Sequence, residues 1–222
     1  MAKQAYKYPR IFVACSYRYP FDKKGLERCL RSLPVTVHFL DSKLKTKQLF
    51  RLVRDALAQA DFSLFDVSTW NPNVSMELGL AEGLDSRYYI LLNSKQKKGV
   101  PSDLQGLQRI EYTSFHGRER SLEFQFVKYF LLGLTYTRRI STKIGPDPKR
   151  EKLLIAALRV LGFLRDHDEI KLDQVQGIAE GLNLRLADRK KVLKALSEVA
   201  VVRLQKGSKY YVLDRDLFKK WT

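Results

Sequence analysis

The sequence contains few of the residues that bind metals or cross-link small folds through disulfide bonds. Only two cysteines and three histidines occur among 222 residues, and neither Cys-x-x-Cys nor His-Glu-x-x-His is present. A disulfide framework and a zinc site are therefore excluded. Glycine-rich phosphate loops are missing as well, because neither G-x-G-x-x-G nor G-x-x-x-x-G-K-[ST] occurs. This argues against dehydrogenases and P-loop enzymes, and we expect neither a metal nor a cofactor.

Long apolar runs are also absent. No stretch approaches the roughly 18–20 apolar residues that cross a bilayer, and the first 20 residues contain no apolar segment of the signal-peptide type. We therefore expect a cytoplasmic protein with no membrane partner.

The chain does carry a surplus of positive charge. Its 41 lysines and arginines against 24 acidic residues give a net charge of +17. Such a charge attracts polyanions through counterion release, so nucleic acid is a candidate partner. The same charge also fits a surface that serves solubility alone.

Strand-like and helix-like patterns alternate through the first 134 residues. Apolar runs typical of buried strands occur at 10–16, 35–40, 61–68, 87–93 and near 109–112. Helical spacing of apolar residues fills the intervals, at 22–33, 42–60, 74–84 and 122–134. This alternation predicts an α/β fold with an open, parallel, five-stranded sheet of the flavodoxin-like or Rossmann-like kind, covered by helices on both faces.

The chain changes character around residue 140, where glycine, proline and basic residues replace the periodic pattern. We predict a first domain over 1–140, a linker over 141–149 and a smaller domain over 150–222. Three helical patterns in the second domain precede two β-rich runs that a Lys-Gly-Ser-Lys turn joins. This order is typical of a winged helix-turn-helix domain.

Ligands of open parallel sheets bind beyond the carboxyl ends of the strands, so the residues there are candidate contacts. Ser16 and Tyr17 lie at the end of the first predicted strand, and Asp66 lies in the third predicted strand. The third strand leads into a polar loop and a helix that carries Glu77. A helix N-terminus favours the ionised carboxylate, which suits attack on a sugar carbon or stabilisation of an oxocarbenium-like transition state. Glu77 also fits an acid that only complements the helix dipole.

These segments resemble a known family. The strand RIFVACS, the strand DFSLFDVS, the stretch NPNVSMELGLAEGL and the strand RYYILLN resemble the nucleoside 2-deoxyribosyltransferases and the related TIR-like nucleotide-binding proteins. The resemblance covers roughly residues 8–132, and its sharpest part is the loop with the Glu-Leu-Gly helix. It implies that Glu77 attacks or stabilises the anomeric carbon of a nucleoside, a nucleotide or NAD.

The resemblance also implies substrate contacts around Glu77. Asp61 corresponds to the acid at the start of the third strand, and Asn71 stands where some transferases have an acidic residue. Asp66, Asn73 and Ser75 are implied as ribose or phosphate contacts, and Ser16 and Tyr17 fit the first-strand loop. The neutral side chain of Asn71 leaves base recognition and proton delivery to the leaving base unassigned.

The predicted winged domain offers cations for phosphate contacts on its third helix and at its wing tip. These are Arg185, Arg189, Lys190, Lys191, Lys194, Lys206 and Lys209. Because the helix is rich in lysine, binding to DNA is expected to show little sequence specificity. Contacts to another protein are the alternative use of such a domain.

The sequence thus predicts an enzyme that cleaves an N-glycosidic bond, as a hydrolase or a deoxyribosyltransferase, with a winged helix that docks DNA or a nucleoprotein partner. The pairing resembles effector modules of bacterial antiphage systems, including those of some retrons. One alternative is a non-catalytic, nucleotide-sensing DNA-binding regulator. Another is a basic scaffold that binds nucleic acid through both domains, including the helix with residues 43–54. A homo-oligomer is compatible with each of these interpretations.

Overall fold

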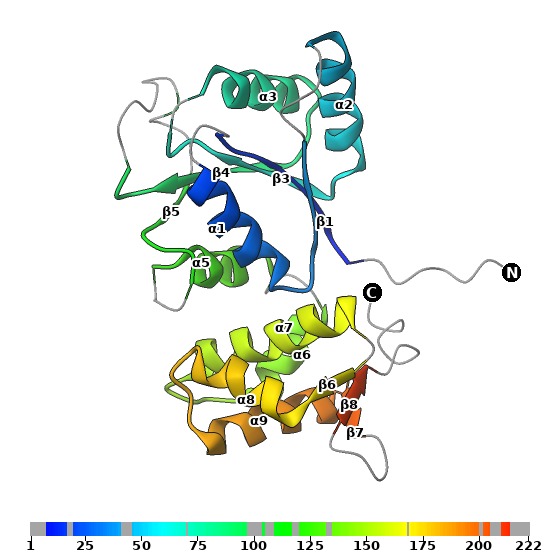
Figure 1. Cartoon of the computed structure of the whole chain (residues 1–222), viewed down its shortest axis with the longest axis vertical. Coiled ribbons are helices and arrows are strands. Elements are labelled where there is room, and N and C mark those ends of the chain that lie inside the picture. The colour runs from blue at the N-terminus through cyan, green and yellow to red at the C-terminus, as the bar shows by residue number, and fades with distance from the viewer. Residues whose placement is uncertain are drawn as a thin grey trace, which may run out of the picture. The chain divides into compact units, whose positions relative to one another are not determined.

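The computed structural model describes residues 8–16, 20–40, 46–69, 71–96, 104, 109–116, 120–131, 135–167, 169–199, 202–204 and 210–213. The chain divides into two compact units (Figure 1). The first comprises Pro9–Arg31 and Val35–Gln125, and the second comprises Ser32–Pro34 and the chain from Phe126 onward, together with Tyr8. None of the described helices combines the length and apolar character that crossing a membrane requires.

Five strands form the sheet of the first unit. They are β1 (Arg10–Ala14), β2 (Thr36–Phe39), β3 (Phe62–Asp66), β4 (Tyr88–Asn93) and β5 (Arg109–Tyr112). Their order across the sheet is β2-β1-β3-β4-β5, and every pairing is parallel. These observations confirm the predicted α/β fold and its open, five-stranded parallel sheet.

Helices cover both faces of this sheet (Figure 1). Helix α1 (Pro20–Arg31) lies on one face, whereas α2 (Thr46–Gln59) and α3 (Pro72–Gly83) lie on the other. Because both faces are covered, all five residues of β3 are buried. This explains why the strands read as continuous apolar runs rather than as alternating patterns. Helix α5 (Leu122–Tyr129) follows β5, and the division between the two units falls within it.

The face under α2 and α3 forms a well-defined hydrophobic cluster. The strands contribute Phe12, Ala14, Phe65, Ile90 and Leu92, the helices contribute Val53, Leu57, Val74, Leu78 and Ala81, and Val67 joins them from just after β3. Each fully buried side chain of the size of Val or Leu stabilises the fold by about 1.5–3 kcal/mol. Two such anchors on α3, Val74 and Leu78, fix the position of this helix against the sheet together with the smaller Ala81.

The start of α3 is set by its sequence. Asn71 is the N-cap residue, and its side-chain oxygen accepts a hydrogen bond from the Asn73 backbone N–H at 2.9 Å. Pro72 occupies the first turn, where no donor is needed. The Asn-Pro pair therefore begins the helix at a defined residue and places Glu77 in its second turn.

On the opposite face, α1 approaches Phe115 closely. A Cβ atom added at Gly25 would lie 2.3 Å from the Phe115 ring, so this position has room only for glycine. One turn further along α1, the Cys29 thiol donates a hydrogen bond to the Phe115 carbonyl at 3.2 Å. Cys29 is fully buried.

The second unit combines helices with a small antiparallel sheet. Its elements are α6 (Thr135–Ile144), α7 (Arg150–Asp166), β6 (Glu169–Lys171), α8 (Leu172–Glu180), α9 (Leu186–Glu198), β7 (Val202–Leu204) and β8 (Tyr210–Leu213). The strands pair in the order β6-β8-β7. The three helical patterns predicted from the sequence correspond to α7, α8 and α9.

Two elements of this unit are absent from the sequence-based expectation. Helix α6 runs through residues 141–144, where we expected a linker. Its buried side includes Thr137 and Ser141 beside Tyr136 and Ile140, so its apolar periodicity is weak. Strand β6 has only three residues, of which one is buried, so its sequence shows no recognisable strand pattern.

Helix α7 is buried around most of its circumference and packs against the segment Ser32–Pro34. A Cβ atom added at Gly162 would lie 2.3 Å from the Ser32 carbonyl oxygen. The Arg165 guanidinium donates a hydrogen bond to the Leu33 carbonyl at 3.1 Å. The absence of a side chain at Gly162 therefore permits the backbone of α7 to reach this segment.

Candidate active site

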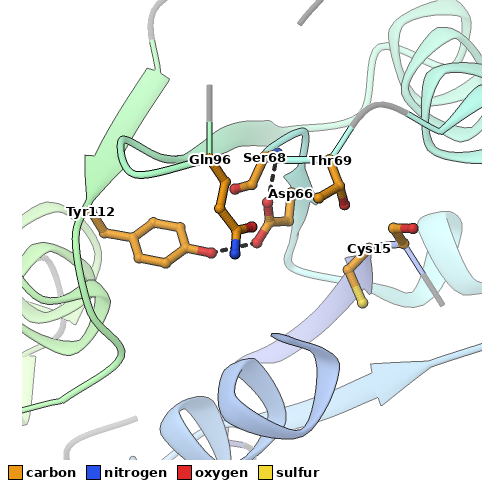
Figure 2. A pocket seen from close by; sticks show the side chains of 7 residues that line it. Cys15, Asp66, Ser68, Thr69, Gln96 and Tyr112 are labelled. Carbon is orange, nitrogen blue, oxygen red and sulfur yellow. Dashed lines mark hydrogen bonds between the residues drawn. The ribbon is translucent and has the colours of Figure 1, made fainter. Parts of the chain in front are cut away.

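Asp66, the last residue of β3, is held by two hydrogen bonds (Figure 2). The Ser68 backbone N–H donates to its Oδ1 at 2.9 Å, and the Tyr112 hydroxyl donates to its Oδ2 at 2.6 Å. The Asp66 side chain is buried, and Tyr112 is the last residue of β5. The carboxylate is therefore fixed in orientation at the carboxyl edge of the sheet.

The loops that follow three neighbouring strands meet at this edge. The Asn71 side-chain amide donates to the Ser16 hydroxyl at 3.4 Å, which joins the loop after β3 to the end of β1. The Asn93 backbone N–H donates to the Ser68 hydroxyl at 2.6 Å, which joins the same loop to the end of β4. Ser16 and Ser68 are both buried.

Glu77 projects from the second turn of α3, and only 7% of its surface is exposed. Burial raises the pKa of its carboxyl group to about 7. This corrects the expectation that the helix N-terminus keeps Glu77 ionised, because the dipole effect falls off within the first turn while desolvation acts in full. The protonated and ionised forms of Glu77 are therefore both well populated near neutral pH.

The pKa of the Cys15 thiol responds to both carboxyl groups. Its pKa is raised to about 12, first by burial and next by the charge of Asp66. The charge of Glu77 raises it as well, whereas the positive charge of Lys23 opposes these effects. Asp66, Glu77 and Lys23 thus all act electrostatically on the same thiol at the end of β1. Cys15 is a neutral thiol rather than a nucleophile.

A small hollow opens beside Asp66 (Figure 2). It has room for about one water molecule. It is lined by Cys15, Ser16, Asp66, Ser68, Thr69, Gln96 and Tyr112. Apart from the thiol, every lining side chain carries a hydrogen-bonding oxygen, so the hollow suits a polar group.

The structure brings together some of the residues predicted as substrate contacts. Ser16, Asp66 and Asn71 lie at the carboxyl edge of the sheet, near the helix that carries Glu77. Tyr17 lies outside the described residues.

Asp61, Asn73 and Ser75 are placed differently. Asp61 precedes β3 at the opposite edge of the sheet, roughly 16 Å from Asp66 by strand rise. Its carboxylate accepts a hydrogen bond from the Arg10 backbone N–H at 2.7 Å, so it ties two strand starts together. Asn73 is exposed and Ser75 is half-buried in the first turn of α3. The structure does not bring Asp61 to the site.

Sequence reasoning missed Tyr112 and Gln96. Tyr112 ends a strand of four residues that carries no motif, and Gln96 lies in a basic stretch after β4. Their positions could have indicated them, since Tyr112 is the last residue of one parallel strand and Gln96 follows the carboxyl end of another. Among the described residues, no group of three His, Cys, Asp or Glu side chains is placed to hold a metal ion.

The cations predicted to contact nucleic acid lie on α9 and just before it. Arg185, Lys190, Lys191 and Lys194 are exposed, and Arg189 is half-buried. Two of the lysines form ion pairs, Lys191 with Asp147 at 2.6 Å and Lys194 with Glu198 at 3.6 Å. Lys206 and Lys209 lie outside the described residues.

A short network fixes the start of α9. The Arg185 backbone N–H donates to Asp188 Oδ2 at 2.9 Å, and the Lys149 ammonium group donates to the same oxygen at 2.8 Å. Asp188 is buried, so the two donors offset the cost of removing its charge from water.

Comparison with known proteins gives similarity to solved structures. No protein-family model matches the sequence, and no curated protein matches it either. Among solved structures, the chain is similar to the Clostridium botulinum CMP N-glycosidase BcmB, with 19% sequence identity and a TM-score of 0.41. The similarity covers 56% of this chain and 99% of the N-glycosidase chain.

Proposed function

We propose that the chain is an enzyme that cleaves the bond between base and sugar in a nucleoside, a nucleotide or NAD. The observation that carries this proposal is Glu77, a buried carboxyl group with a pKa of about 7 at the carboxyl edge of a parallel sheet. A second carboxylate, Asp66, is held by fixed donors in the same region. Reactions at an anomeric carbon are commonly catalysed by two carboxyl groups in different environments.

In the proposed reaction the ionised Glu77 carboxylate attacks the anomeric carbon or stabilises its developing positive charge. The bond from this carbon to the base nitrogen breaks, and the electron pair leaves with the base. A purine or pyrimidine base takes up a proton from water, whereas nicotinamide leaves NAD as a neutral molecule and takes up none. Water in a hydrolase, or a second base in a transferase, then adds to the anomeric carbon and loses a proton to solvent, and any bond to Glu77 breaks to return the carboxylate. Burial strengthens the electrostatic effect of Glu77 because little water screens it.

The proposal is tested by chromatography of the products. The chain is incubated with separate pools of nucleosides, nucleotides and NAD, and free base or nicotinamide is measured with and without added DNA. Release of a base would establish the activity and identify its substrate. Saturable nucleotide binding without release from any pool would contradict it and favour the nucleotide-sensing regulator.

The pKa of Glu77 predicts the pH dependence of this activity. Because the ionised form is the reactive one, kcat/KM is expected to rise about tenfold per pH unit well below pH 7 and to level off above it. Initial rates measured between pH 5 and 8.5 at constant ionic strength check this. A flat profile across that range, or a fall as the pH rises through 7, would contradict the assignment.

For the second unit we propose a nucleic-acid-docking role. Lys190, Lys191 and Lys194 lie within about 100° around the axis of α9, because successive residues advance by about 100°. All three are exposed, while Val192 and Leu196 of the same helix are buried. A cationic face opposite an apolar anchor is the arrangement that contacts phosphates along a duplex.

A salt titration with a duplex of arbitrary sequence tests this role. Replacing both Arg185 and Lys190 with alanine is expected to weaken binding at low salt and to reduce the slope of log K against log salt by about 2. The matched control replaces Arg51 and Arg54 with alanine. Both are exposed on α2, and their replacement removes the same amount of charge. An equal loss in the control would instead support binding through both units.

A further inference from the structure

The hollow beside Asp66 contains an acceptor that lacks a donor. The side-chain oxygen Oε1 of Gln96 is buried and has no hydrogen-bond partner. Leaving such an acceptor unpaired away from water is costly, and native proteins rarely do so without a reason. Gln96 lines the hollow together with Asp66 and Tyr112 (Figure 2). The unpaired oxygen therefore belongs to the candidate active site.

The dimensions of the hollow restrict what could supply the missing donor. Its volume admits about one water molecule, which is too little for a base or a sugar ring. A hydroxyl group on the edge of a bound sugar would fit. Such a group could donate its proton to Gln96 Oε1 and occupy the place of one water.

The hollow lies beside the start of the helix that carries Glu77. Its lining includes Ser16, whose hydroxyl accepts a hydrogen bond from the side-chain amide of Asn71, the N-cap residue of α3. Glu77 acts at the anomeric carbon in the proposed reaction. The hydroxyl next to that carbon is the 2′-hydroxyl.

We propose that Gln96 Oε1 accepts a hydrogen bond from the 2′-hydroxyl of the substrate, so the enzyme prefers ribosides to 2′-deoxyribosides. This inference rests on the proposed function and deepens it by naming the sugar. Removing the hydroxyl leaves the buried Gln96 oxygen without a donor, and a site built for a hydroxyl rejects the analogue that lacks it.

The test compares base release from each ribonucleotide with release from its 2′-deoxy counterpart. For wild type, kcat/KM is expected to be about ten- to a hundredfold higher for the ribonucleotide. In the Gln96→Leu variant this ratio should fall to about one to three, because leucine fills the space without an acceptor. Gln96→Ala should give the same ratio, and circular dichroism melts show whether either variant is folded.

A matched control is Gln59→Leu, which makes the same change at an exposed position at the end of α2 and should keep the wild-type ratio. Equal rates of wild type on both sugars would overturn the inference while leaving the proposed function standing. If no substrate is cleaved, the proposed function fails, and calorimetric binding of the same nucleotide pairs then tests the inference alone. Equal affinities of wild type for both sugars would overturn it.

Discussion

Replacing Glu77 with glutamine is expected to lower the rate of base release by about 10³- to 10⁴-fold. The amide has nearly the same shape as the carboxyl group, so the packing of α3 against the sheet is retained. It carries no negative charge, however, and it can neither attack the anomeric carbon nor stabilise a positive charge on it. Initial rates of base release at pH 8, where wild type is ionised, measure the effect.

Glu82→Gln is the matched control for this variant. Glu82 lies on the same helix, but it is exposed and accepts a hydrogen bond from the Tyr88 hydroxyl at 2.6 Å. This change should alter the rate by less than about threefold, since surface substitutions are usually close to neutral. Retention of more than a tenth of the wild-type rate in Glu77→Gln would remove Glu77 from the mechanism.

Glu77→Gln is expected to lower the activity but to raise the stability of the fold at pH 8. The pKa of Glu77 is about 7 in the folded chain and near 4.5 when unfolded, so the folded state holds its proton more tightly. The free energy of unfolding of wild type therefore falls as the pH rises through this window, by up to about 3 kcal/mol. Glu77→Gln lacks this loss, and at pH 8 it should unfold at a higher denaturant concentration than wild type.

Gly162→Ala is expected to destabilise the second unit by about 1–3 kcal/mol. The new methyl group would lie 2.3 Å from the Ser32 carbonyl oxygen and 2.8 Å from its carbon, so the backbone of α7 or of Ser32–Pro34 must move. This strain outweighs the roughly 1 kcal/mol that alanine normally gains over glycine inside a helix. Urea unfolding followed by circular dichroism gives the difference.

Gly177→Ala on α8 provides the comparison. Nothing lies within 4 Å of a Cβ atom at Gly177, so only the helical preference of alanine acts there. This variant should be neutral or more stable by about 0.5–1 kcal/mol. If Gly162→Ala were as stable as Gly177→Ala, the close approach of α7 to Ser32 would not be a feature of the folded protein.

The sequence is sufficient to predict the sheet, because each strand is buried on both faces and therefore reads as a short apolar run. It also places Glu77 on the helix after the third strand, since helical spacing resumes at Val74, although α3 begins two residues earlier at Pro72. Helix α6 does not follow from the pattern, because Thr137 and Ser141 occupy part of its buried side. The position of Asp61 at the far edge of the sheet depends on where β3 begins, and element boundaries are the least certain part of a sequence-based prediction.

The chemical character of the site is harder to predict than its location. Burial raises the pKa of Glu77, and this burial arises only when α3 packs against the sheet. Gln96 and Tyr112 join Asp66 only when β4 and β5 pair beside β3. Neither residue belongs to a motif, so the sheet order is needed before they can be recognised.

The burial of both cysteines makes the chain suitable for site-specific labelling. Cys29 is enclosed under Phe115, and the pKa of Cys15 is about 12, so hardly any thiolate is present at neutral pH. Maleimide reagents should therefore leave the folded protein almost unmodified. A single cysteine introduced at an exposed position of each unit would then carry a fluorophore without prior removal of the native thiols, which would allow the separation of the two units to be followed in solution.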